Sequence, residues 1–264
     1  MAEKVIEKEN IFRTARKLGE PESAKFSAMS SHKKLIEYSF EFSGVGKEDR
    51  MMIVDLGGGQ GGLGRIVEDL RKQGRDITCV NVDYSIKELL KGGGDRVLGD
   101  MMQLPLRNNS ADAVFVISYY LDAENLMKHI NEYKIGWKDV DERNHLLQNL
   151  ADIADWQERL FMLEAARVLK KGGKLITAGD FDPSILMNQV SGRELTKVFE
   201  LRRKEVVKIE DEVKGIAVYE KMKDEGLEGR IAEAREQLKS LVELLEIYEA
   251  KGGLLWRMRK EGRI

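Results

Sequence analysis

Short apolar runs alternate with amphipathic stretches through the first two thirds of the chain. Five runs rich in apolar and β-branched residues indicate strands, at residues 53–55, 77–83, 96–98, 113–118 and 174–178. Helical patterns separate the first three runs, and residues 156–169 form another amphipathic pattern before the fifth. Because parallel strands need long crossover connections, this alternation predicts an α/β fold with a doubly wound, Rossmann-like parallel sheet covered on both faces.

The pattern changes after the fifth strand. Residues 205–209 and 216–222 are rich in β-formers, and the six residues between them are too few for a crossover helix. We therefore expect these two runs to pair as an antiparallel hairpin. A parallel sheet that ends in such a hairpin differs from the usual dinucleotide-binding fold, whose last strands are parallel.

Two further segments surround or interrupt the sheet. Residues 1–48 should form N-terminal helices, at 4–19 and 31–42, that cover the substrate side of a sheet domain at 49–224. Residues 123–153 are too long for a plain connection, so we expect helical turns that act as a lid with few buried contacts. The apolar residues of this insertion that are spaced for one helical face are Leu126, Ile130, Tyr133 and Trp137.

The C-terminal segment, 225–264, carries a heptad pattern followed by a basic tail. Its apolar positions are spaced 4-3-4-3-4-3, at Leu227, Ile231, Ala234, Leu238, Leu241, Leu245 and Tyr248. Two interpretations stay open: one long helix packed on its own domain, or a helix that pairs with a partner in a homodimer.

Composition narrows the range of partners. The chain has 44 basic and 46 acidic residues, so its global charge favours neither nucleic acid nor an anionic membrane. Its single cysteine, Cys79, lies in an apolar run, where it should be a packed core thiol; one cysteine favours a reducing, cytoplasmic location. No run approaches the ~20 apolar residues of a membrane span, and no Cys/His cluster has metal-ligand spacing.

The most informative segment is residues 51–62, an apolar run that ends in Asp55 and continues into a glycine cluster. Strand, glycine-rich turn and helix in this order are typical of nucleotide binding. A carboxylate just before the loop would repel a pyrophosphate, but it suits the α-ammonium group of S-adenosylmethionine (SAM). The spacing of Gly57, Gly59 and Gly62 also fits the dinucleotide motif of an NAD-dependent oxidoreductase, and a turn without a ligand is the third possibility.

Two other carboxylates follow the next strands. Asp83 ends the second strand, where it can accept hydrogen bonds from both ribose hydroxyls. Asp100 follows the third strand and can accept from the adenine amino group, while the Met101 N–H meets a ring nitrogen. The alternatives are structural: Asp55 as a strand-end cap, Asp83 as a turn residue and Asp100 as a helix N-cap.

Four motifs in order resemble the class I SAM-dependent methyltransferases, and most of all the methyltransferase type 11 group that includes the ubiquinone/menaquinone-pathway enzymes. They are residues 54–61 (Val-Asp-Leu-Gly-Gly-Gly-Gln-Gly), 82–85 (Val-Asp-Tyr-Ser), 99–105 (Gly-Asp-Met-Met-Gln-Leu-Pro) and 167–173 (Arg-Val-Leu-Lys-Lys-Gly-Gly). The resemblance covers about residues 50–222. It implies a seven-stranded sheet of order 3-2-1-4-5-7-6 with strand seven antiparallel, SAM as the cofactor and S-adenosylhomocysteine as its product. The implied cofactor-binding residues are Asp55, Gly57, Gly58, Gly59, Gly61, Asp83, Tyr84, Asp100, Met101 and Ser118.

The chain departs from this family at two places. Lys171 stands where the group usually has proline, a small change within a turn. The group often has a histidine near the end of strand four, where this chain has Tyr-Tyr-Leu-Asp at 119–122. No catalytic base is therefore assigned, and the candidates are Tyr119, Tyr120 and Asp122. The Asn/Asp-Pro-Pro-Tyr motif of base-amino methyltransferases is absent.

The expected reaction is SN2 transfer of the SAM methyl group to a small-molecule acceptor. RNA or protein is the alternative substrate, and the support for it is the basic stretch at 254–260. A SAM-binding or scaffolding protein without turnover is the third hypothesis. The sequence does not identify the acceptor or the methylated atom.

Overall fold

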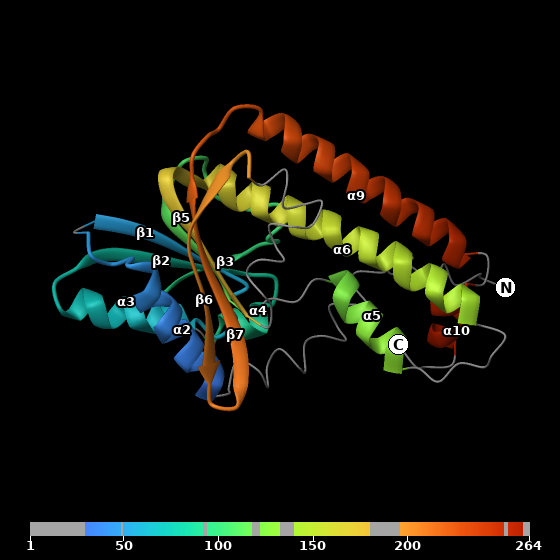
Figure 1. The fold of residues 1–264 in the computed structure, drawn as a ribbon, viewed down its shortest axis with the longest axis horizontal. Helices are drawn as coiled ribbons and strands as arrows, with labels where there is room; N and C mark the ends of the chain where they lie inside the picture. The colour runs from blue at the N-terminus through green and yellow to red at the C-terminus, as the bar shows by residue number, and fades with distance from the viewer. Residues whose placement is uncertain are drawn as a thin grey trace, which may run out of the picture. The chain divides into compact units, whose positions relative to one another are not determined.

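The computed structural model describes residues 30–48, 50–91, 94–117, 122–132, 140–179, 196–250 and 253–260 (Figure 1). The chain divides into two compact units, each built from segments that are distant in sequence. The described residues of the sheet unit fall within Ser23–Tyr119 and Glu158–Ala234. Those of the helical unit fall within Tyr120–Gln157 and Arg235–Ile264.

The sheet unit contains one seven-stranded sheet in the order β3-β2-β1-β4-β5-β7-β6, which is the order that the family resemblance implied. Its strands are β1 Arg50–Leu56, β2 Asp76–Asp83, β3 Asp95–Leu98, β4 Ala111–Ile117, β5 Leu169–Gly179, β6 Phe199–Ile209 and β7 Glu212–Lys221. Strands β1 to β5 pair in parallel, and β7 is antiparallel to both β5 and β6. The predicted hairpin is therefore confirmed.

The strand register brings three loops to one edge of the sheet. The β1–β2 ladder ends at Leu56 opposite Val82, and the β2–β3 ladder ends at Asp83 opposite Leu98. Because these strands are parallel, the segments that follow β1, β2 and β3 all leave the sheet at its carboxyl edge. Nearly every residue of β1 and β4 is buried, which requires cover on both faces of the sheet.

Strand β6 forms the far edge of the sheet, since only β7 pairs with it. Its eleven residues include three consecutive cationic side chains, Arg202, Arg203 and Lys204, and the ladder to β7 shifts register between Leu201 and Arg203.

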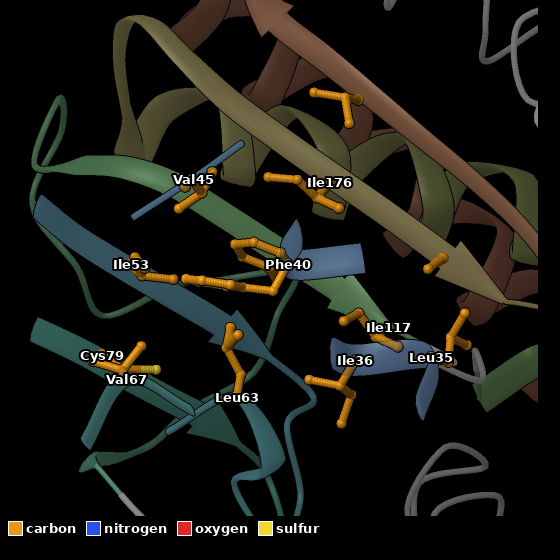
Figure 2. Packing of buried hydrophobic residues seen from close by; sticks show 14 of the residues in the cluster. Leu35, Ile36, Phe40, Val45, Ile53, Leu63, Val67, Cys79, Ile117 and Ile176 are labelled. Atoms are coloured by element: carbon orange, nitrogen blue, oxygen red, sulfur yellow. The ribbon is translucent and has the colours of Figure 1, made fainter. Parts of the chain in front are cut away.

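Helices α2 (Ser30–Ser43) and α3 (Gly62–Lys72) pack on one face of the sheet. Phe40 of α2 stacks on Phe115 of β4 with ring centroids 6.0 Å apart, and Figure 2 shows Phe40 beside Ile53 within the same cluster. Cys79 lies in this cluster and is buried, so the prediction of a packed thiol is confirmed. The buried apolar side chains of α2 hold this helix against the sheet, next to the loop that follows β1.

The helical unit contains α5 (Asp122–Glu132), the first part of α6 (Val140–Val168), the last part of α9 (Leu227–Ala250) and α10 (Leu254–Lys260). Helix α6 begins sixteen residues before the start predicted from its apolar pattern, because Leu146, Leu150 and Ile153 continue a buried face. None of the described helices combines the length and apolar character needed to cross a membrane.

The predicted lid segment is more firmly packed than expected. Leu126 and Ile130 of α5 are fully buried, and the Ala123 N–H donates to Gln157 Oε1 at 3.2 Å. The expectation of few buried contacts is wrong for α5, because both apolar positions of its inner face find partners. Tyr133 and Trp137, predicted to lie on the same face, are outside the described residues, as is the predicted helix at 4–19.

The heptad positions of α9 are largely buried within the single chain. Leu227, Ile231 and Ala234, in the sheet unit, and Leu245, in the helical unit, are all at most 4% exposed. In the helical unit, Tyr248 also meets the His145 ring edge-on at 6.0 Å. These contacts support a helix packed on its own chain, and a homodimer through this seam is not shown.

Candidate cofactor site

The loop between β1 and α3 has a backbone that only glycine adopts readily. Gly57, Gly59 and Gly61 have φ angles of 67°, 47° and 67°, in the left-handed region. The Gly57 N–H donates to the Val82 carbonyl at 2.8 Å, and the Gly61 N–H donates to the Gly58 carbonyl at 2.8 Å. The three alternating glycines in the sequence therefore form a tight loop that is hydrogen-bonded to β2.

Gly58 is required for a different reason. A Cβ atom at this position would collide with the side chain of Asp55 and would lie 2.9 Å from Asn81 Oδ1. The loop backbone thus passes directly over two buried polar side chains. Glycine at position 58 therefore leaves room for the Asp55 carboxyl beneath the loop.

Asp55 is a buried acid at the end of β1, only 4% exposed. Burial raises its pKa from 3.8 to about 7, and the negative charge of Asp83 adds to this shift. Within the described part of the chain, no lysine or arginine forms an ion pair with Asp55. A cation bound beside this carboxyl would supply the missing compensation.

Asp83, at the end of β2, connects two loops through its carboxylate. Its Oδ2 accepts from the Gly59 N–H at 3.0 Å, and its Oδ1 accepts from the Ser85 N–H at 2.7 Å. Burial raises the pKa of Asp83, and these hydrogen bonds offset part of that rise. A carboxylate has about four lone-pair positions, so capacity remains for hydroxyl donors.

Asn81 is a site residue that the sequence did not reveal. It is fully buried, its Nδ2 donates to the Gly59 carbonyl at 3.1 Å, and its Oδ1 makes no hydrogen bond to the described residues. The available signal in the sequence was an amide side chain between two apolar residues of the strand, Val80 and Val82. Gln60 extends the network, since its Nε2 donates to Glu88 Oε2 at 3.1 Å.

Asp100 and Met101 form a turn after β3. Asp100 Oδ1 accepts from the Met102 N–H at 2.9 Å, and the Gln103 N–H donates to the Asp100 carbonyl at 3.0 Å. The helix N-cap interpretation of Asp100 is wrong, because the residues after it form a turn and no helix. The Met101 methyl lies next to Gly57, within ordinary van der Waals distance of where a Cβ would be.

The structure thus brings Asp55, the loop glycines, Asp83, Asp100 and Met101 to one edge of the sheet. Tyr84 follows there with 37% of its surface exposed. Ser118, Tyr119 and Tyr120 lie outside the described residues, and Asp122 is the first residue of α5 in the helical unit. In the described part of the chain, no group of acidic, histidine and cysteine side chains is arranged to hold a metal ion.

A cavity of about 310 Å³ opens beside the glycine loop in the sheet unit. Residues of α2, the loop and α3 line it, among them His32, Ile36, Gly58, Gln60 and Arg65. Burial, together with the nearby charge of Lys214, lowers the pKa of His32 to about 4, so its imidazole is neutral at physiological pH. The cavity volume is at the small end of the range for ligand sites.

Comparison with known proteins agrees with this geometry. Residues 54–134 match the family model described as a methyltransferase domain. No curated protein matches the chain. Among solved structures, the complex between the Haloferax volcanii Trm112 methyltransferase activator and a putative methyltransferase is similar, with 14% identity and a TM-score of 0.53 over 80% of this chain and 98% of that one. The [4+2]-cyclase SpnF is also similar, with 14% identity and a TM-score of 0.51 over 81% of this chain and 98% of that one.

The matched segment contains the glycine loop, Asp83 and Asp100. With the sheet order and the antiparallel β7, it identifies the sheet unit as a class I SAM-dependent methyltransferase fold. The methyl donor of this class is SAM, in agreement with the cofactor expected from the sequence. Because one similar structure is described as a cyclase, the fold alone does not fix the reaction.

Proposed function

We propose that the protein transfers the methyl group of SAM to a small-molecule acceptor. The observation that carries this proposal is the buried Asp55 carboxyl under the glycine loop, where no basic side chain of the described residues compensates for its charge. The α-ammonium group of SAM is a cation that would supply this compensation. A dinucleotide would place a pyrophosphate there, and the antiparallel β7 also argues against a dinucleotide fold.

The remaining cofactor contacts follow the order of the strands. Asp83 accepts the ribose hydroxyls, Asp100 accepts from the adenine amino group, and the Met101 N–H donates to a ring nitrogen. Tyr84 and Ser118 complete the candidate set. Asp83 is well placed for its role, because its two oxygens already lie between the glycine loop and the start of α4 (Ile86–Leu89).

In the transfer itself, a lone pair of the acceptor attacks the methyl carbon while the carbon–sulfur bond breaks and its electrons return to sulfur. The sulfonium is already activated, so the protein mainly aligns the reactants and excludes water. If the acceptor atom carries a proton, a base must remove it. Tyr119, Tyr120 and Asp122 stay the candidates for this step, since they come soon after β4 in the sequence.

Two features favour a small acceptor: the cavity beside the glycine loop, and the burial and ion pairing of side chains in the basic stretch at 254–260. In α10, Leu254, Leu255 and Met258 are buried, and Arg257 donates to Glu142 within the helical unit. Several side chains of the 254–260 stretch are therefore engaged in contacts within the protein, which weakens its support for an RNA substrate. We also propose that residues 1–48 and 123–153 cover the substrate side of the 49–224 domain.

Two measurements test this function. Calorimetry should show that SAM and S-adenosylhomocysteine bind and that NADH does not. Radiolabelled SAM is then incubated with the protein and cell extract, and the label is followed into small-molecule, RNA and protein fractions, with Asp55→Asn as the matched inactive control. Label in the small-molecule fraction is expected. Label in RNA or protein would favour the alternative substrates, and SAM binding without transfer to any fraction would indicate a non-catalytic protein.

A further inference from the structure

One arginine of α6 holds the segment that follows the Asp100–Met101 turn. Arg167 Nη2 donates to the Leu104 carbonyl at 2.8 Å, and Nη1 donates to the Leu106 carbonyl at 2.8 Å. Nη1 also donates to Asn108 Oδ1 at 2.7 Å. A single planar guanidinium thus fixes three acceptors spread over five residues, which a lysine ammonium could not match in geometry.

Glu164, one helical turn earlier, completes this contact. Its carboxylate is fully buried, and its Oε2 accepts from the Leu104 N–H at 3.1 Å and from Arg167 Nε and Nη2 at 3.1 and 2.7 Å. Both backbone groups of Leu104 are therefore bonded to the pair. A buried carboxylate is costly without such partners, so these two charges depend on the position of Leu104.

The contact extends from Leu104 to the cofactor side of the sheet. Gln103 is hydrogen-bonded to the Asp100 carbonyl, and Pro105 lies so close to Gly99 that a Cβ on this glycine would be 2.9 Å from Pro105 Cδ. The Gly99 N–H in turn donates to the Asp83 carbonyl at 3.0 Å. The segment 99–106 is thus closed on itself, with Glu164 and Arg167 at one end and Asp83 at the other.

We propose that Glu164 and Arg167 are positioning residues for adenine recognition: they hold the Asp100–Met101 turn where it meets the base. This inference rests on the proposed roles of Asp100 and Met101. Neither Glu164 nor Arg167 touches the cofactor in this scheme. Their effect passes through Leu104 and Pro105, so the adenine half of SAM should be sensitive to them and the methyl-transfer step should not.

The test measures discrimination between two ligands. The full chain is titrated with SAM and with its deaminated analogue, in which the 6-amino group of adenine is replaced by oxygen. Asp100 should make the wild type prefer SAM. Arg167→Met and Glu164→Gln should weaken SAM binding roughly 10- to 100-fold, the scale of a small misplacement in a site, and should reduce the preference for SAM over the analogue. Arg167→Lys should rescue the charge but little of the preference.

The control is Lys170→Met, which removes an ion pair to Asp112 at the start of β5, just after α6 ends. Lys170→Met should leave the affinities for SAM and for the analogue unchanged. A variant that only loses stability should bind both ligands more weakly, with the ratio of the two affinities unchanged. In turnover assays the KM for SAM should rise while kcat at saturation stays near the wild-type value.

Each outcome decides the inference. Variants that keep the wild-type preference for SAM would overturn it. A wild type that binds SAM without preferring it to the analogue would remove the Asp100 contact and overturn it as well, while a wild type that binds no SAM would refute the proposed function first. If the variants of the buried pair do not fold, Asn108→Ala removes one exposed acceptor of Arg167; it should reduce the preference in the same direction, and no change would contradict the proposal.

Discussion

Asp83 and Gly59 are hydrogen-bonded across the carboxyl edge of the sheet, where the Gly59 N–H donates to Asp83 Oδ2 at 3.0 Å. This bond joins the end of β2 to the middle of the glycine loop that follows β1. The same carboxylate that should accept the ribose hydroxyls therefore also shapes the loop before any ligand binds. Loss of Asp83 should affect the loop and the cofactor together.

We expect Asp83→Ala to weaken SAM binding by about 1.5–3 kcal/mol, the range for hydrogen bonds to a charged group. Calorimetry at constant pH measures this loss. Ser85→Ala, which keeps the Ser85 N–H bond to Asp83, is the control and should change affinity little. Binding of NADH more tightly than SAM would contradict the assignment of the whole site.

The stability of the ligand-free protein should fall as the pH rises from about 4 to about 7. Burial raises the pKa of Asp55 from 3.8 to about 7, so the folded state holds this proton more tightly than the unfolded state. Ionisation of Asp55 therefore costs stability across that window, and the cost is complete above pH 7. Asp55→Asn should raise the melting temperature at pH 8 and leave it nearly unchanged at pH 4. Equal effects at both pH values would argue against the raised pKa.

SAM affinity should show the opposite dependence on pH. An ammonium group beside Asp55 favours the ionised carboxylate, so binding near pH 6 should release a proton and become tighter towards pH 8. Calorimetry in buffers of different ionisation enthalpy measures the proton directly. Asp55→Asn should bind more weakly and release no proton, and proton uptake by the wild type would place the ammonium elsewhere.

The seam of α9 provides a matched pair of substitutions. Leu245 is 2% exposed and its neighbour Leu244 is 64% exposed. Leu245→Ala should cost about 2–5 kcal/mol of unfolding free energy, whereas Leu244→Ala should stay within about 0.5 kcal/mol. Thermal melts measure both. Sedimentation should show the same mass for the wild type and both variants, and a dimer that Leu245→Ala dissociates would restore the partner-helix interpretation.

The insertion after β4 should be needed for transfer and dispensable for the cofactor. We expect replacement of residues 123–138 by a short Gly/Ser linker, which ends before α6 begins, to spare SAM affinity and abolish turnover. Hydrogen exchange should show the buried amides of α5 as protected, because Leu126 and Ile130 are fully covered. Turnover that survives the replacement would show that this segment does not cover the acceptor.

Much of the sheet could be predicted from the sequence, because the central strands β1, β2 and β4 are local apolar runs and the hairpin is a local pattern. The order of the strands needed the family resemblance, since pairing between distant runs leaves no local trace. Asp55 and the alternating glycines could also be predicted from the sequence, because their pattern lies within one short segment of the chain.

The residues that the sequence did not reveal act through space. Asn81 meets Gly59 across 22 positions, and Arg167 meets Leu104 across 63. In the sequence Arg167 was recognised only as the first residue of the 167–173 motif, because nothing near it in the chain indicates which backbone carbonyls its guanidinium binds. The beginning of α6 was also misplaced, since its first four turns carry an apolar face that becomes evident only when α5 packs beside it within the helical unit.

The outer strand β6 bears on how the protein behaves at high concentration. An edge strand of eleven residues is a template on which another chain could add a strand and begin to aggregate. In β6 the consecutive cations Arg202, Arg203 and Lys204 repel an identical strand, and the register shift beside them bends the edge away from a flat ladder. Arg202 is also bonded to Glu200 and Glu220, which holds its charge at that edge. The β6 edge is thereby protected against the addition of a strand from another chain.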